Sequence, residues 1–225
     1  ALPISTGALT ITGTTAELTD ALVTASKLVV ASNGSAAVIF ESGDDPTGAE
    51  LAAINPKVGG NITLANNAQT FTGSASDMKA AFSGGLQGTQ TGNVTINDTE
   101  GNIAATTLTD ITSETSGTVT AAEAGITITG NSTQLTAALV TAETKAVMAN
   151  GDVTITDTGT VDATVLSGIG NITGGTVTAT GALTITGTTA ELTDALVTAS
   201  KLVVASNGSA AVIFDAGDDP SGAEL

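Results

Sequence analysis

Short strands of alternating threonine and apolar residues recur along the chain, and each is followed by two apolar residues spaced for a helix. The strand signal is the motif x-T-x-T-G, which ends at Gly13, Gly73, Gly130 and Gly187. After each glycine come two apolar residues four positions apart, namely Leu18/Leu22, Met78/Phe82, Leu135/Leu139 and Leu192/Leu196. Because residues four apart share one face of a helix, the pattern predicts a strand and then a short helix in each repeat.

The start of each predicted helix carries a capping signal. Four tetrapeptides resemble capping boxes: Thr14-x-x-Glu17, Ser74-x-x-Asp77, Asn131-x-x-Gln134 and Thr188-x-x-Glu191. In such a box the first side chain accepts a free backbone N–H, and the fourth side chain reaches back to the cap. Asp45-Pro46 and Asp219-Pro220 predict further helix starts, with aspartate as the cap and proline at the first helical position.

The chain contains a long internal duplication. Residues 183–225 repeat residues 9–51 after 174 positions, and only three positions differ: Glu41/Asp215, Ser42/Ala216 and Thr47/Ser221. The motif glycines divide this unit further, because they follow one another at steps of 60, 57 and 57 residues. These distances predict an N-terminal cap or junction at 1–8, three repeats at 9–68, 69–125 and 126–182, and a partial repeat at 183–225, all in one continuous body.

Each repeat reads as two turns of strand, short helix and strand. No single turn can bury its own apolar face, so the turns must stack on their neighbours. The fold class predicted is therefore mainly β: a parallel β-solenoid with short helices or helical turns in most coils. An array of small β-sandwich modules is the alternative, and the helical spacing argues against it. The glycine-rich stretch 82–92 predicts the loosest turn.

Composition narrows the function. Aromatic residues make up only 2% of the chain and hydrophobic residues 41%, which suits a core of small aliphatic rows. The net charge of −17 predicts repulsion of nucleic acid and of anionic membranes. No apolar run approaches the roughly 18–20 residues of a membrane span. The chain has no Cys and no His, so the usual thiolate ligands and the usual general base are missing, and we expect no enzyme.

One acidic turn is a candidate cation site, and it occurs twice. Its carboxylates are Glu41, Asp44 and Asp45 in the first copy and Asp215, Asp218 and Asp219 in the second. Three carboxylates within five residues suit Ca²⁺, which accepts irregular oxygen cages. Calcium is thus the one cofactor that the sequence suggests. The alternative is that Asp45 caps a helix while the other carboxylates are solvated.

The string TITGTTAELTDAL at residues 10–22, followed by Thr/Val strands, resembles the repeat regions of giant bacterial cell-surface proteins of the cyanobacterial type, including S-layer-like and adhesin-like proteins. The resemblance covers the whole chain and implies an extracellular structural segment of a fibre, surface layer or adhesin stalk. Such a segment would associate head-to-tail with itself or with further repeats. The alternatives are a calcium- or glycan-binding surface module and a solenoid enzyme that acts on polysaccharide.

Overall fold

The computed structural model describes residues 9–24, 36–121, 123–141, 146–198, 203–205, 210–218 and 220–221. The chain divides into two units. The first comprises Ala1–Asn97 with Ser113–Val119, and the second comprises Asp98–Thr112 with Thr120–Leu225. The short strand β7 (Val119–Thr120) lies at the boundary.

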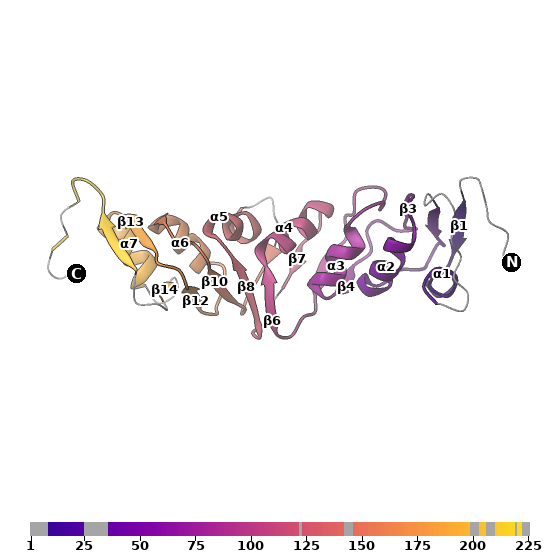
Figure 1. The fold of residues 1–225 in the computed structure, drawn as a ribbon, viewed down its shortest axis with the longest axis horizontal. Helices are drawn as coiled ribbons and strands as arrows, with labels where there is room; N and C mark the ends of the chain where they lie inside the picture. Colours follow the sequence, from indigo (N-terminus) through magenta and orange to yellow (C-terminus); the bar gives the residue numbers. More distant parts are fainter. Residues whose placement is uncertain are drawn as a thin grey trace. The chain divides into compact units, whose positions relative to one another are not determined.

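Strands and helices alternate along the first unit (Figure 1). Its strands are β1 (Thr10–Gly13), β2 (Ala37–Phe40), β3 (Ile62–Thr63), β4 (Phe71–Gly73) and β5 (Val94–Ile96). Its helices are α1 (Thr15–Leu22), α2 (Gly48–Ile54), the 3₁₀ turn η1 (Asn55–Lys57) and α3 (Ala75–Phe82). Strands β1, β2 and β3 form one parallel sheet in that order, and β4 pairs in parallel with β5.

The second unit repeats this alternation. Its strands are β6 (Gly101–Ala104), β8 (Ile126–Gly130), β9 (Ala146–Val147), β10 (Asp152–Ile155), β11 (Thr160–Asp162), β12 (Val177–Ala179), β13 (Thr184–Gly187), β14 (Val203–Ala205) and β15 (Ala211–Phe214). Its helices are α4 (Ala105–Glu114), which runs past the boundary, α5 (Ser132–Leu135), the π-helical turn η2 (Thr136–Val140), α6 (Ala163–Gly170) and α7 (Thr189–Leu196). Figure 1 shows β8, β10 and β12 side by side in a sheet of order β14-β12-β10-β8-β6, and β11-β13-β15 form a second sheet.

The core of the second unit is organised by the strand register. One row of β-branched side chains crosses the five-stranded sheet, and its members are Ile103, Ile128, Val153, Val177 and Val203. All five side chains are buried. Branched side chains pack well on a pleated surface, so this row holds neighbouring strands in register. In the first unit the aromatic pair Phe71–Phe82 is packed edge to face, with ring centroids 5.1 Å apart.

The predicted fold class is wrong. Within the described residues the strands form four separate parallel sheets of three to five strands, and seven α-helices alternate with them, so the chain is α/β and not a mainly-β solenoid. The helices are longer than the predicted helical turns, because α1, α3, α6 and α7 have eight residues each and α4 has ten. Parallel strands need a crossover, and a helix is the usual one. All strand pairs described are parallel, unlike those of a β-sandwich.

The capping predictions are largely confirmed. Thr14, Asn131 and Thr188 form complete capping boxes with Glu17, Gln134 and Glu191. The Ser74 hydroxyl accepts the Asp77 N–H at 3.1 Å, and it also donates to the Asp77 carboxylate at 2.8 Å. The prediction for Asp45 is wrong, because Thr47 is the N-cap of α2 and forms its own capping box with Glu50. The matching cap at Asp219 lies outside the described residues.

Candidate functional site

The acidic turn after β2 contacts the start of α1. Asp44 Oδ2 accepts a hydrogen bond of 2.5 Å from the Thr15 N–H and another from the Thr15 hydroxyl. The second copy repeats the contact, because Asp218 Oδ2 accepts from the N–H and the hydroxyl of Thr189. Both turns contain a glycine in the left-handed region, with φ of 85° at Gly43 and 92° at Gly217. Each aspartate is half-buried and supplies a second acceptor to a helix that already has its own cap.

A third contact of the same kind was missed by the sequence analysis. The Ser132 N–H donates to Asp157 Oδ2 at 2.5 Å, and the Ser132 hydroxyl donates to Asp157 Oδ1 at 2.9 Å. The strand pairing explains all three contacts. The strands before α1, α5 and α7 pair in parallel with β2, β10 and β15, so the loop after each partner strand lies beside the helix start. A carboxylate is favourable there because the free N–H groups carry partial positive charge.

The other predicted ligands lie apart from this contact. Glu41, Asp45 and Asp215 are exposed, and Asp219 lies outside the described residues. Within the described part of the chain, no three carboxylates come close enough together to hold a metal ion. The structure therefore gives Asp44 and Asp218 a helix-capping role. Calcium binding at these turns stays a prediction.

Replacing Asp44 by alanine separates these two roles. We expect Asp44→Ala to lower the free energy of unfolding by about 0.5–2 kcal/mol, the usual cost of losing a helix cap. The exposed Asp45→Ala is the matched control and should have little effect. Thermal unfolding with and without EDTA, on protein saturated with Ca²⁺ beforehand, measures both changes. Destabilisation by EDTA that both variants abolish would show calcium binding at this turn.

The capping box of α1 also changes the pKa of the Glu17 carboxyl. Glu17 Oε2 accepts the Thr14 N–H at 3.0 Å and the Thr14 hydroxyl at 2.9 Å. These two hydrogen bonds, the backbone one first, lower the pKa of the exposed Glu17 carboxyl below its ordinary value of 4.5, against smaller opposing effects of desolvation and then of the Asp44 charge. The carboxylate form is thus stabilised by folding.

The lowered pKa predicts a pH dependence of stability. The unfolded state binds the Glu17 proton at higher pH than the folded state does. The contribution of Glu17 to stability is therefore complete above pH 4.5 and is lost as the pH falls through the lower pKa of the folded state. Glu17→Gln should flatten the pH dependence of the unfolding free energy in this window. NMR titration of the Glu17 carboxyl carbon checks the pKa directly, and a midpoint at or above the ordinary value would contradict the prediction.

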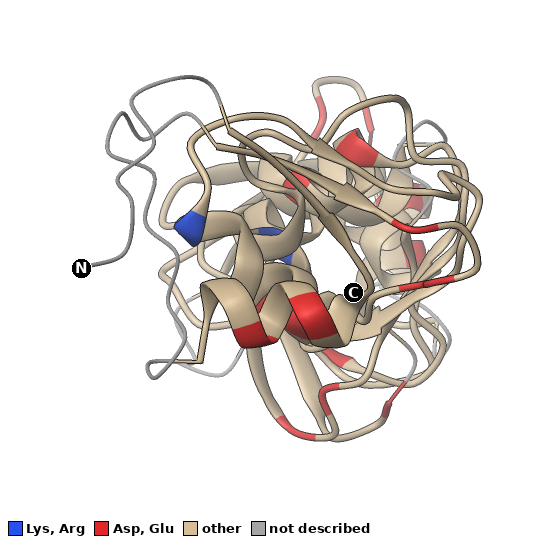
Figure 2. Ribbon diagram, turned by 90° about the vertical axis from the view of Figure 1, so that its right-hand side faces the viewer, with Lys and Arg blue, Asp and Glu red and all other residues tan. Residues whose placement is uncertain are grey.

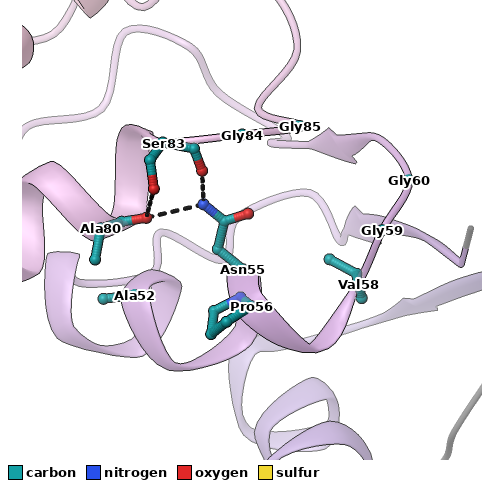
Figure 3. A pocket seen from close by; sticks show the side chains of 10 residues that line it. All are labelled: Ala52, Asn55, Pro56, Val58, Gly59, Gly60, Ala80, Ser83, Gly84 and Gly85. Atoms are coloured by element: carbon teal, nitrogen blue, oxygen red, sulfur yellow. Dashed lines mark hydrogen bonds between the residues drawn. The ribbon is translucent and has the colours of Figure 1, made fainter. Parts of the chain in front are cut away.

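A pocket of about 500 Å³ lies in the first unit beside the end of α3, and the sequence analysis did not predict it. Figure 3 shows Asn55 at its wall, with its side-chain nitrogen directed at the end of α3. Asn55 Nδ2 donates to the carbonyls of Ala80 at 2.8 Å and Ala81 at 3.2 Å, and also to that of Ser83. The last carbonyls of a helix lack N–H partners within it. Asn55 and the Ser83 hydroxyl, which donates to the Ala80 carbonyl at 2.9 Å, therefore cap the end of α3.

The chemistry of this pocket is limited. Four of its ten lining residues are glycines, namely Gly59, Gly60, Gly84 and Gly85, and none of the ten has a titratable side chain. Gly85 lies so close to the neighbouring loop that an added Cβ would lie 2.3 Å from the Gly60 carbonyl oxygen. The pocket offers hydrogen-bonding groups but no acid or base, and its one hydroxyl, that of Ser83, donates to the Ala80 carbonyl at 2.9 Å and has no base among the lining residues to activate it. We therefore interpret it as the seam between two packed loops.

Acidic side chains dominate the charged surface. Figure 2 shows many Asp and Glu positions and few Lys positions on the ribbon, as the 22 acidic and 5 basic residues of the sequence require. A groove of about 480 Å³ in the first unit is lined by Glu17, Asp20 and Glu50. The carboxylates of Glu17 and Glu50 are already bound by the caps of their own helices, so this groove is not a preformed cation cage.

The chain matches no protein-family model, no curated protein and no solved structure. Among the described residues, none of the helices has the length and apolar character that crossing a membrane requires. Interpretation of the function therefore rests on the residues and their arrangement.

Proposed function

We propose that this chain is a structural repeat segment of an extracellular fibre, surface layer or adhesin stalk, and that it has no catalytic role. One observation carries the proposal: the two copies of the duplicated sequence form the same strand pair, helix cap and aspartate contact. Strand β1 pairs with β2 with Thr10 opposite Ala37, and β13 pairs with β15 with Thr184 opposite Ala211. The register of this strand pair is thus the same in both copies.

The contacts that define the unit are local to it. In each copy a capping box starts the helix, and an aspartate 29 residues further on binds the first helical residue. Stability in tandem repeats is approximately a sum of terms within repeats and between neighbours. A unit of this kind can therefore be repeated in tandem without new kinds of contact, which suits a structural protein that must span a long distance. A single binding or catalytic site does not call for two near-identical copies.

The location and the partners follow from the same proposal. A surface fibre or layer made of such units would lie outside the cell, and its acidic coat would keep neighbouring segments soluble through mutual repulsion. Its partners would be further copies of this chain or further repeats of the same sequence, associated head-to-tail.

Immunogold electron microscopy tests the proposal. Antibodies raised against the purified chain should label a fibre, layer or stalk outside the cells that produce it. Pre-immune serum on the same sections is the control for non-specific labelling. Label confined to the cell interior, or spread over material without any repeating structure, would contradict the proposal.

A further inference from the structure

The pocket beside the end of α3 contains a hydrogen-bond acceptor that no described residue satisfies. The Asn55 side chain lies at its wall and is only 7% exposed. Its Nδ2 group donates to three backbone carbonyls at the end of α3, whereas its Oδ1 accepts no hydrogen bond from any described residue. Leaving a buried acceptor without a donor is unfavourable, so we expect a bound molecule to supply the donor.

The orientation of the Asn55 amide is fixed by its contacts with α3. If the amide were turned over, its oxygen would face three carbonyl oxygens with no proton between them. Oδ1 therefore points away from α3, and Figure 3 shows it directed toward residues 58–60 on the other side of the pocket. A Cβ at Gly84 would lie 3.3 Å from Oδ1, so the glycine leaves room beside this oxygen.

The pocket also offers donors, a second acceptor and apolar walls. Gly59 and Gly84 line it, and their N–H groups donate to no described residue. The Ser83 hydroxyl donates to the Ala80 carbonyl and can still accept a hydrogen bond. The volume of about 500 Å³ lies within the usual range of small-molecule sites. The apolar part of the lining consists of the side chains of Ala52, Pro56, Val58 and Ala80.

The absence of charge from this lining narrows the class of ligand. None of the ten lining residues is Asp, Glu, Lys or Arg. Burying a charged group without a partner is far more costly than burying a neutral polar group that is hydrogen-bonded. A carboxylate, a phosphate or an ammonium group would therefore enter without a counter-charge. A neutral ligand with several hydroxyl groups fits better, because each hydroxyl can both donate and accept.

We propose that the pocket beside Asn55 binds a neutral hexose unit of a sugar. One sugar hydroxyl donates to Asn55 Oδ1, neighbouring hydroxyls accept from the N–H groups of Gly59 and Gly84, and the C–H groups of the ring contact the apolar walls. The inference goes beyond the proposed function, because it gives a structural segment a ligand of its own. It depends only on contacts within the first unit, between the loop after α2 and the end of α3.

NMR titration of the full-length chain, labelled with ¹⁵N, tests this site with glucose, galactose and mannose as probes. We expect at least one of these sugars to shift the backbone amides of Gly59 and Gly84 and the side-chain amide of Asn55. The shifts should saturate with a dissociation constant in the millimolar range, as expected for a ligand of this size. Glucuronic acid and glucosamine carry a carboxylate and an ammonium group on the glucose ring, and each should bind at least about tenfold more weakly than the neutral sugar.

A matched pair of variants in α2 checks the location of the site. Ala52 lines the pocket and is half-buried, so Ala52→Leu places extra bulk inside it and should weaken sugar binding at least about tenfold. Ala53 is also half-buried but does not line the pocket, so Ala53→Leu should leave the dissociation constant unchanged. Circular dichroism shows whether both variants are folded. If Ala52→Leu does not fold, the amide shifts of the unaltered chain still locate the bound sugar.

Three results would overturn the sugar site. The first is that none of the three neutral sugars binds. The second is that glucosamine binds and the neutral sugars do not, because the pocket then selects an ammonium group. The third is that the shifts lie away from Gly59, Gly84 and Asn55, or that a folded Ala52→Leu variant binds as tightly as the unaltered chain. None of these results bears on where the chain is located in the cell, so the proposed function and this site can fail separately.

Discussion

Leu22→Ala should destabilise the protein far more than Leu196→Ala, although the two leucines lie in identical sequence. Leu22 in α1 is 1% exposed, whereas Leu196 in α7 is half-buried. Truncating a buried leucine costs about 2–5 kcal/mol, because apolar contact is lost and a cavity remains. We expect Leu22→Ala to fall within this range and Leu196→Ala to cost less than half as much.

A second pair of leucines serves as the control for this comparison. Leu18 and Leu192 are also counterparts, and both are buried, with 1% and 5% of their surfaces exposed. Their alanine variants should therefore cost similar amounts. The chain has no Trp and no Tyr, so urea unfolding is followed by circular dichroism. Equal costs for Leu22 and Leu196 would contradict the difference in burial between these two leucines.

The local signals in the sequence were sufficient to place the helices that begin with a cap. Thr14, Asn131 and Thr188 form the predicted capping boxes, because both partners of a box lie within four residues. The apolar pairs behind the caps also face inward, and of the leucines among them only Leu196 is incompletely buried. Patterns of this length therefore predict structure only over one or two helical turns.

The fold class depended on information that such patterns lack. The frequent threonines favoured strands by their β-branching, yet α4 contains four of them within ten residues, in the sequence ATTLTDITSE. The spacing of Leu108 and Ile111 indicated only a helical patch, and both residues are completely buried on a helix that extends beyond them in both directions. How far a helix extends, and where one sheet stops, is decided by packing between distant segments.

The candidate site shows the same limit. The partner of Asp44 is Thr15, 29 positions away, and the contact forms because β1 and β2 are parallel neighbours. The sequence held a usable signal, namely a Thr or Ser at the first helical position and an aspartate 25–29 residues later, after the partner strand. This signal predicts a contact between the aspartate and the helix start only when the two strands are known to pair. Because the sequence alone does not give the pairing, the three acidic residues of the turn were interpreted as a cation site.

The glycine-rich stretch 82–92 was predicted to be the loosest turn, and in the structure its backbone packs closely on a neighbouring loop. The loop that ends at Gly92 lies directly on the loop of Ala68 and Gln69, and the Thr91 N–H donates to the Asn67 carbonyl at 2.7 Å. The Gln90 side chain is 1% exposed and its Nε2 donates within the loop, to the Gly88 carbonyl at 3.0 Å. Glycine is required at Gly92 because the two loop backbones approach closely.

Gly92→Ala should consequently be among the most damaging single substitutions in the chain. A Cβ at this position would lie 1.6 Å from the Gln69 carbonyl oxygen and 2.9 Å from the Ala68 carbonyl oxygen. Both atoms belong to the backbone, so no side-chain rotation relieves the clash, and the two loops must separate. The next loop would be disturbed as well, because the Thr115 hydroxyl donates to the Gly92 carbonyl at 2.7 Å. We expect a loss of about 3 kcal/mol or more, at or beyond the upper end of ordinary overpacking.

Gly159→Ala is the matched control, because nothing lies within 4 Å of a Cβ at that position and its φ is not in the left-handed region. This variant should change stability by less than about 1 kcal/mol, and toward greater stability, since alanine restricts the unfolded chain. Thermal unfolding by circular dichroism compares the two variants, and amide hydrogen exchange shows which unit opens. The damage from Gly92→Ala should appear first at Thr91, whose N–H holds the two loops together. Equal melting temperatures for the two variants would contradict the prediction, because they would mean that the loop backbones at Gly92 and Gln69 lie further apart than described.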